Sequence, residues 1–295
     1  MSKFIWKKIG IIYKPDNNHS QLLTHASNPL ATHLYDDVFR IFYSGRDEKN
    51  RSSVSFVDMD IKTLKKVDDH KKPIVCFGSE DSFYSHGITI GNLWEKDGES
   101  FIGFMGWQHR PNQHWRGDIG KFNVSTKEVS LVLGNNNVDK VSLSYPFVMK
   151  DGNIYKMWYG STISWTSEND EMIHVLNYAE SKDSINWDVK GESIPWELGV
   201  AQAFSRPSVI KINEEYHMWY SYRSGDGTPY RIGYSNSLNG LDWKNLNSNI
   251  DVSNEGWDSE MVCYPFVFKH GDTLFMLYNG NSYGKDGFGL ATCKI

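Results

Sequence analysis

The stretches SYPFVMKDGNIYKMWYGS, residues 144–161, and CYPFVFKHGDTLFMLYNGN, residues 263–281, decide the fold. Each runs from one strand through a short Asp-Gly or His-Gly turn into a second strand, which is the pattern of a β-hairpin. In each, a proline stands at the first strand position, where the missing backbone N–H is tolerated. The two stretches therefore predict that the chain builds the same hairpin more than once.

The start of this hairpin recurs along the whole chain. A small polar residue is followed by a variable residue, then by Pro or Gly, and then by an apolar run. The variable residues are Asn28, His86, Tyr145, Arg206 and Tyr264, and successive members are 58, 59, 61 and 58 residues apart. The mean spacing of 59 divides the 295 residues into five repeats, so we expect one domain, 1–295, without a linker.

Each repeat carries the pattern of four strands. The hairpin is followed by a third strand, such as residues 174–181 or 231–237, and by a turn that opens a fourth. Four strands at this period predict an all-β fold, a five-bladed β-propeller with four-stranded blades. The fifth repeat stops after its third strand, whereas Phe4 to Tyr13 is a strand without a repeat. We expect this N-terminal strand to close the last blade.

Composition excludes several classes of function. The net charge of −5 argues against nucleic-acid binding, and no apolar run approaches the length of a membrane span. Lys7 and Lys8 interrupt the only apolar stretch near the N-terminus, so no signal peptide is expected. Three distant cysteines give neither a disulfide framework nor a zinc motif, and they predict a cytoplasmic protein. Aromatic residues are abundant, at 14%, which suits stacking on sugars, although most of these rings are expected in the core.

The repeat also predicts which residues share a face. In a propeller, the starts of the first strands and the loops between strands two and three open on one side. Six arginines fall on that face, and clustered arginines favour carboxylate or phosphate groups. We therefore expect an anionic small-molecule carbohydrate as ligand, with Arg206 reaching the channel axis; the alternative is that several of these arginines pair with loop carboxylates. The predicted substrate-binding residues are Asn28, Arg46, His86, Trp107, His109, Tyr145, Arg206, Arg223 and Tyr264.

Two turns strengthen this interpretation through a resemblance. Ser181 to Trp187, and more loosely Ser237 to Trp243, have a Ser-x-Asp-x-x-x-Trp-like pattern. Together with the repeated x-Pro strand starts, they resemble the five-bladed propeller glycosidases of glycoside hydrolase families 43, 32 and 68, and more distantly family 130. The resemblance implies a carboxylate just before the first proline, but this sequence has Asn28-Pro29. An asparagine side chain can neither take up a proton at neutral pH nor form a glycosyl ester.

Glycosyl transfer needs a pair of carboxyl groups near the anomeric carbon. The candidates we select are Glu260 as the acid, Asp258 beside it, and Asp47. The alternative is that Asp258 and Glu260 cap a turn or pair with an arginine, and that Asp47 organises its loop through an ion pair.

Two functions stay open at this stage. The first is a carbohydrate-active enzyme that cleaves or transfers a glycosyl group in a central pocket. The second is a non-catalytic or repurposed propeller that binds a carbohydrate or sugar nucleotide in a surface-polysaccharide pathway, which the asparagine at position 28 favours. No cofactor is expected, and the His109–His114 pair is a weak basis for a metal site, so none is expected either.

Overall fold

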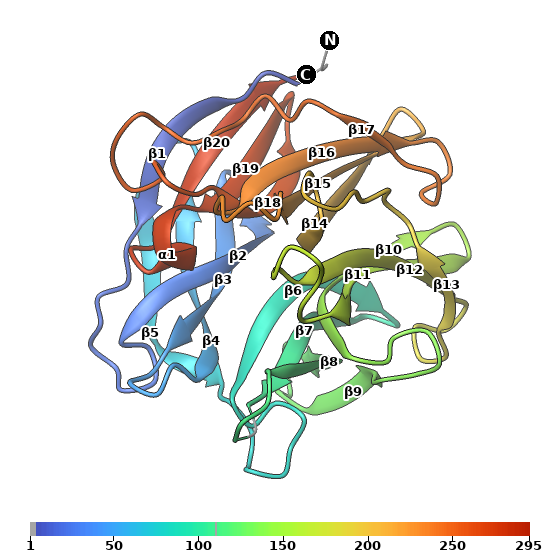
Figure 1. Cartoon of the computed structure of the whole chain (residues 1–295). Helices are drawn as coiled ribbons and strands as arrows, with labels where there is room; N and C mark the ends of the chain where they lie inside the picture. The colour runs from blue at the N-terminus through green and yellow to red at the C-terminus, as the bar shows by residue number, and fades with distance from the viewer. Residues whose placement is uncertain (1–3, 110) are drawn as a thin grey trace.

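The computed structural model describes residues 4–109 and 111–295 and confirms that the chain is all-β. Within these residues, strands β1 to β20 are accompanied by one short helical element, α1 (Asn281–Gly284). Even this element departs from a right-handed helix, because Ser282 and Tyr283 have φ values of 53° and 59°. Figure 1 shows the strands arranged around the middle of the molecule.

Antiparallel pairing joins the strands in consecutive sets of four. The first set is β2 (Thr24–Tyr35), β3 (Val38–Arg46), β4 (Ser52–Asp60) and β5 (Lys66–Val75). The second is β6 (Gly87–Lys96), β7 (Glu99–Gln108), β8 (Arg116–Asn123) and β9 (Val129–Leu133). The third is β10 (Ser142–Asp151), β11 (Ile154–Ser164), β12 (Ile173–Ser181) and β13 (Asp188–Glu192). The fourth is β14 (Ala203–Ile212), β15 (Glu215–Arg223), β16 (Arg231–Ser237) and β17 (Lys244–Leu246).

The last set combines the two ends of the chain. It consists of β18 (Cys263–His270), β19 (Thr273–Asn279), β20 (Phe288–Lys294) and β1 (Lys7–Tyr13). β1 pairs antiparallel with β20, as Figure 1 shows for the blue and red strands. The predicted pairing of the N-terminal strand is therefore confirmed, although the strand begins at Lys7 instead of Phe4. The Phe4 ring packs instead against the rings of Trp219 and Tyr234 in the preceding set.

The first strand of each set contains a bulge in its pairing register. In four sets the bulge consists of a residue with a left-handed φ followed by proline, at Asn28, Tyr145, Arg206 and Tyr264, whose φ values are 57°, 41°, 48° and 54°. Residues other than glycine rarely adopt this left-handed region of φ. A bulge of this kind changes the direction in which the side chain of the bulged residue points. These four positions were predicted to be equivalent, and their shared bulge confirms it.

The second set departs from the prediction. Its register skips between Ile90 and Leu93, so the bulge holds Gly91 and Asn92 instead of His86 and Gly87. A Cβ atom at residue 91 would lie 2.0 Å from the carbonyl oxygen of Pro146, so glycine is required by this contact. The expectation that His86 occupies the equivalent position is corrected: Gly91 takes it, and His86 stands before the start of β6.

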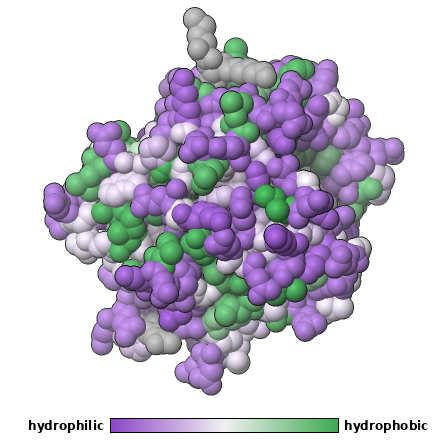
Figure 2. All heavy atoms as spheres, turned by 90° about the vertical axis from the view of Figure 1, so that its right-hand side faces the viewer, coloured by the Kyte–Doolittle hydropathy of each residue, from purple (hydrophilic) through white to green (hydrophobic). Residues whose placement is uncertain are grey.

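The core consists of rings and aliphatic side chains between the sets of strands. Trp158 and Trp219 are fully buried, as expected for core residues. On the side that Figure 2 shows, hydrophobic residues are scattered among hydrophilic ones. No helix among the described residues is both long and apolar enough to cross a membrane.

Candidate functional site

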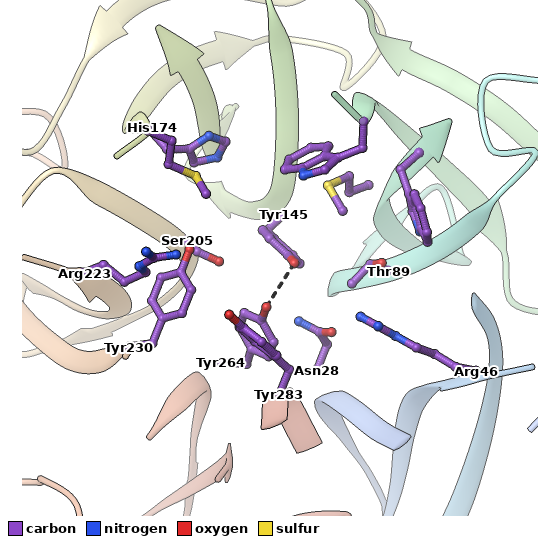
Figure 3. A pocket seen from close by; sticks show the side chains of 14 residues that line it. Asn28, Arg46, Thr89, Tyr145, His174, Ser205, Arg223, Tyr230, Tyr264 and Tyr283 are labelled. Carbon is purple, nitrogen blue, oxygen red and sulfur yellow. Dashed lines mark hydrogen bonds between the residues drawn. The ribbon is translucent and has the colours of Figure 1, made fainter. Parts of the chain in front are cut away.

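A pocket of about 280 Å³ opens in the middle of the molecule, where the bulged strands meet. Side chains from all the sets of strands reach it. Its lining residues are Asn28, Arg46, Thr89, Met105, Trp107, Trp115, Tyr145, Met172, His174, Ser205, Arg223, Tyr230, Tyr264 and Tyr283. Figure 3 shows how the labelled members of this group point toward a shared space.

Three of the bulge residues converge at its centre. The hydroxyl of Tyr145 donates to that of Tyr264 across 3.4 Å, which is the dashed line in Figure 3, and Asn28 lies beside them. Tyr145 and Tyr264 are 119 positions apart, and Asn28 comes from near the other end of the chain. The left-handed backbone conformation that the three residues share directs each side chain inward. Backbone strain of this kind often marks functional positions.

Arg206 lies under this centre, and its guanidinium is committed to the backbone. Nη1 donates to the carbonyl of Tyr264 at 3.0 Å, and Nη2 donates to the carbonyls of Asn28, Pro29 and Gly91 at 3.0, 2.8 and 3.2 Å. The residue is only 1% exposed, and burial lowers its pKa to about 9, so it stays charged at neutral pH. Arg206 was predicted to reach the channel axis and to anchor the charge of a ligand. Its Nη atoms instead bind carbonyls of three other sets of strands, so Arg206 ties four sets together, and only its Nε is left without a partner among the described residues.

The floor contains polar groups that lack partners. Asn28 Nδ2, Ser205 Oγ and Arg206 Nε are buried and form no hydrogen bond with any described residue. The residues are 1%, 2% and 1% exposed. Two of the three atoms can only donate, and the hydroxyl can donate as well. Unpaired buried polar groups are costly, so an acceptor atom that reached these donors would stabilise the protein.

Two arginines stand in the walls. Arg46 has no ion pair or side-chain hydrogen bond with the residues that the structure describes, whereas Arg223 binds both carboxylate oxygens of Glu171. The Arg223 guanidinium also lies 5.8 Å from the ring centre of Tyr230. Figure 3 shows Arg46 and Arg223 on opposite sides of the pocket. The site therefore has one paired and one unpaired cationic wall above a buried cation.

The His174 imidazole and the Tyr145 and Tyr264 phenols of the pocket are neutral at physiological pH. His174 bonds the hydroxyls of Ser144 and Thr162, each at 2.7 Å, and burial lowers its pKa to about 4. Burial raises the pKa of the Tyr145 and Tyr264 phenols above their ordinary value. The pocket thus offers neutral hydroxyl and imidazole groups next to fixed positive charge.

None of the three predicted catalytic carboxylates lines the pocket. Asp47 accepts hydrogen bonds from the backbone N–H and the guanidinium of Arg51. It therefore organises its loop through an ion pair, which was the alternative interpretation of this residue. Asp258 is buried, pairs with Lys8 at 2.8 Å and accepts from the Tyr278 hydroxyl at 3.0 Å. Glu260 is exposed, and only its backbone atoms form hydrogen bonds with the residues that the structure describes.

The predicted binding residues of the second set lie at different depths. Trp107 lines the pocket and donates its indole N–H to Ser52 Oγ at 3.1 Å. His86 packs behind it, with ring centres 5.8 Å apart, and His109 is exposed. Arg110, one of the six arginines predicted on this face, lies outside the described residues. Within residues 4–109 and 111–295, no group of three His, Cys, Asp or Glu residues gathers to hold a metal ion.

Several lining residues were not predicted from the sequence: Thr89, Met105, Met172, His174, Ser205 and Tyr230. Ser205 could have been predicted from the repeat, because it is the small polar residue that precedes Arg206-Pro207. Tyr230 and Met172 come from loops before β16 and β12 that share no sequence pattern between repeats. Their positions follow from how the loops fold back over the pocket.

Comparison with known proteins gives relatives along the whole chain. The uncharacterized proteins MT1551 and Rv1502 of two Mycobacterium tuberculosis strains are each 36% identical to it over 302 aligned positions, which cover 98% of this chain and 99% of theirs. No family model matches the chain.

Solved structures with a similar fold include several glycoside hydrolases. One, described as a glycoside hydrolase, has a TM-score of 0.77 at 15% identity and covers 98% of this chain and 91% of its own. The catalytic domain of a Coprinopsis cinerea GH62 α-L-arabinofuranosidase has a TM-score of 0.68 at 10% identity, with coverages of 99% and 96%. The predicted resemblance to glycosidases is therefore confirmed for the fold.

Proposed function

The chain belongs to the same family as these two mycobacterial proteins, and we propose that it binds an anionic carbohydrate in the central pocket. We also propose that its five sets of strands are the five blades of a closed propeller, one domain of residues 1–295. The pairing of β1 with β20 supports the closure. A cytoplasmic location stays a prediction from the cysteine content.

The observation that carries this proposal is the donor-rich floor. Asn28 Nδ2, Ser205 Oγ and Arg206 Nε are buried without partners below a pocket with Arg46 in its wall. A carboxylate or phosphate group brings several acceptor atoms and a negative charge, and it would satisfy these donors together. A neutral hydroxyl would leave the buried cation without a counter-charge.

The rest of the lining suits a sugar ring. Trp107, Trp115 and the tyrosines supply faces for stacking on the apolar side of a pyranose, and the phenolic hydroxyls supply hydrogen bonds. Because burial raises the pKa of the Tyr145 and Tyr264 phenols, they remain neutral donors that do not repel an anion. Aromatic faces beside an anion-binding floor favour a uronic acid, a nonulosonic acid or a sugar phosphate.

Binding fits the geometry better than hydrolysis by paired carboxyl groups. Such chemistry needs two carboxyl groups about 5–10 Å apart around the scissile bond. No Asp or Glu is found among the described residues that line the pocket, and the position that carries a carboxylate in similar glycosidases is Asn28. Of the two functions left open by the sequence, the geometry favours the binding protein.

The experiment compares anionic and neutral sugars by isothermal titration calorimetry. The probes are glucuronic acid, galacturonic acid, N-acetylneuraminic acid and glucose 1-phosphate, with glucose and galactose as neutral partners. At least one anionic probe should bind 10-fold or more tightly than its neutral partner, since a charge-assisted contact contributes about 1.5–3 kcal/mol. The uronic acids and glucose 1-phosphate distinguish a carboxylate site from a phosphate site. Equal binding of neutral and anionic probes, or no binding at all, would contradict the proposal.

An isosteric variant tests the floor itself. Asn28→Asp replaces a donor with a negative charge and should weaken binding of the anionic probe by about 10- to 100-fold. Asn153→Asp adds the same charge on an exposed turn and should leave the affinity unchanged. An unaltered affinity in Asn28→Asp would remove the floor from the site. Release of 4-nitrophenol from 4-nitrophenyl glucuronide by the wild type, abolished in Glu260→Gln, would favour the enzyme instead.

A further inference from the structure

A second hollow adjoins the central pocket, and the two share Trp115 as a wall. The hollow measures about 450 Å³. It is formed mainly by the loop between β7 and β8, the loop between β11 and β12, and the segment before β10. Its lining residues are Gln108, Gln113, His114, Trp115, Arg116, Asn135, Val141 and Trp165.

Three rings form a cluster at this hollow. The His114 ring stacks on Trp165, with centres 4.9 Å apart and planes at 16°, and Trp115 meets Trp165 edge-on at 4.7 Å. His114 is exposed, and both tryptophans are half-buried. No described residue accepts a hydrogen bond from either indole N–H of these tryptophans. Large rings that keep exposed faces and free donors on loops are typical of binding surfaces.

The polar groups of the hollow differ from those of the floor. The amide nitrogen of Gln108 donates to the carbonyl of Ser82 at 2.9 Å, and that of Asn135 donates to the carbonyl of Lys140 at 3.0 Å. Both amide oxygens are left to accept hydrogen bonds. The one cation of the lining, Arg116, is paired with Asp118 at 3.2 Å. The hollow thus offers acceptors, indole donors and ring faces without unpaired charge.

We propose that this hollow holds a second, neutral sugar unit of the ligand whose anionic unit occupies the central pocket. The inference rests on the proposed function and deepens it, because it makes the ligand an anionic oligosaccharide or glycoconjugate instead of a monosaccharide. Trp115 belongs to both spaces, so adjacent units of one chain would lie on either side of it. Ring faces and amide acceptors match the apolar face and the hydroxyl groups of a neutral pyranose.

The experiment compares monosaccharides with longer ligands that contain them. The probe pairs are N-acetylneuraminic acid with 3′-sialyllactose, and glucuronic acid with glucuronosyl-β-1,3-N-acetylgalactosamine. In at least one pair, the longer ligand should bind about tenfold more tightly to the wild type. Trp165→Ala should remove that advantage and leave the affinity for the monosaccharide unchanged.

Two control variants keep the test specific. Trp165→Phe retains a ring and should keep most of the advantage, whereas Tyr35→Ala removes an exposed ring from the end of β2 and should have no effect. If the monosaccharides bind but neither longer ligand binds more tightly, the inference is overturned while the proposed function stands. An equal loss of both affinities in Trp165→Ala also overturns it. Failure of every anionic monosaccharide would instead contradict the proposed function.

Discussion

Two regions of this molecule bury a charge, and they treat it in opposite ways. Beside the last set of strands, Asp258 is 2% exposed and has Lys8 at 2.8 Å and the Tyr278 hydroxyl at 3.0 Å. Below the pocket, Arg206 is 1% exposed and has backbone carbonyls but no carboxylate among the residues described. The first charge is neutralised within the protein, whereas the second is not.

This difference separates a structural charge from a functional one. Lys8 lies in β1 and Asp258 precedes β18, so their pair fastens the N-terminal strand to the final set. The charge of Arg206 stays uncompensated, and its Nε lacks a partner together with two neighbouring polar atoms. A complete set of partners points to stability, and an incomplete set points to a ligand. Asp47 and Asp258, two of the three carboxylates selected from the sequence, have such a complete set of partners.

The largest effect is expected where four backbone carbonyl groups bind the guanidinium of Arg206. Gly91→Ala would place a Cβ atom 2.0 Å from the Pro146 carbonyl oxygen, so the backbone must shift. We expect the free energy of unfolding to fall by about 3 kcal/mol or more, as measured by urea denaturation. Gly134→Ala, where the nearest atom is 3.4 Å away, is the control and should change little. A Gly91→Ala protein as stable as the wild type would show that the floor is not tightly packed.

The paired charge should matter for stability alone. Asp258→Asn leaves Lys8 without its counter-ion, and because Lys8 is partly exposed we expect a loss of about 2 kcal/mol, less than for a fully buried pair. Affinity for an anionic sugar should not change. The control Asp272→Asn breaks an exposed pair with Lys294 and should have no measurable effect on unfolding. Loss of ligand affinity in Asp258→Asn would break the comparison by placing Asp258 in the site.

The smallest effect concerns the pocket wall. Burial lowers the pKa of His174 from 6.5 to about 4, so below pH 6.5 the unfolded chain takes up a proton that the folded protein excludes. Stability is therefore lost as the pH falls, by about 1 kcal/mol between pH 7 and pH 5.5 from this group. Urea denaturation at both values should give a smaller difference for His174→Asn than for the wild type.

The pH test has a matched control variant, and a second buried histidine also contributes to the pH dependence of stability. His33→Asn, which changes an exposed histidine, should keep the wild-type difference between the two pH values. Burial also lowers the pKa of His25 to about 4, so some pH dependence should persist in His174→Asn. An identical difference in wild type and His174→Asn would mean that His174 is accessible to protons and hence that the wall is wetter than its burial indicates.

The sequence by itself determined the strands and their order. Alternating apolar residues, turn dipeptides and prolines at strand starts are local signals. They predicted the hairpins, the pairing of the N-terminal strand and four of the five equivalent positions in the first strands. Asn28, Tyr145 and Tyr264 were found in this way, because each precedes a proline in its repeat. The equivalent position in the second repeat was wrongly assigned to His86, because Gly91-Asn92 carries no proline.

Only the tertiary structure decided which polar groups are paired. Arg206 and Asp258 are both charged residues near strand starts in the sequence, but packing gives Asp258 a partner 250 positions away and gives Arg206 only carbonyls. Partners of this kind depend on how distant loops and strands meet, which no local pattern encodes. The hairpins are determined by residues that are neighbours in the sequence. Which donors of the floor stay unpaired is determined by contacts between residues that are far apart in the sequence.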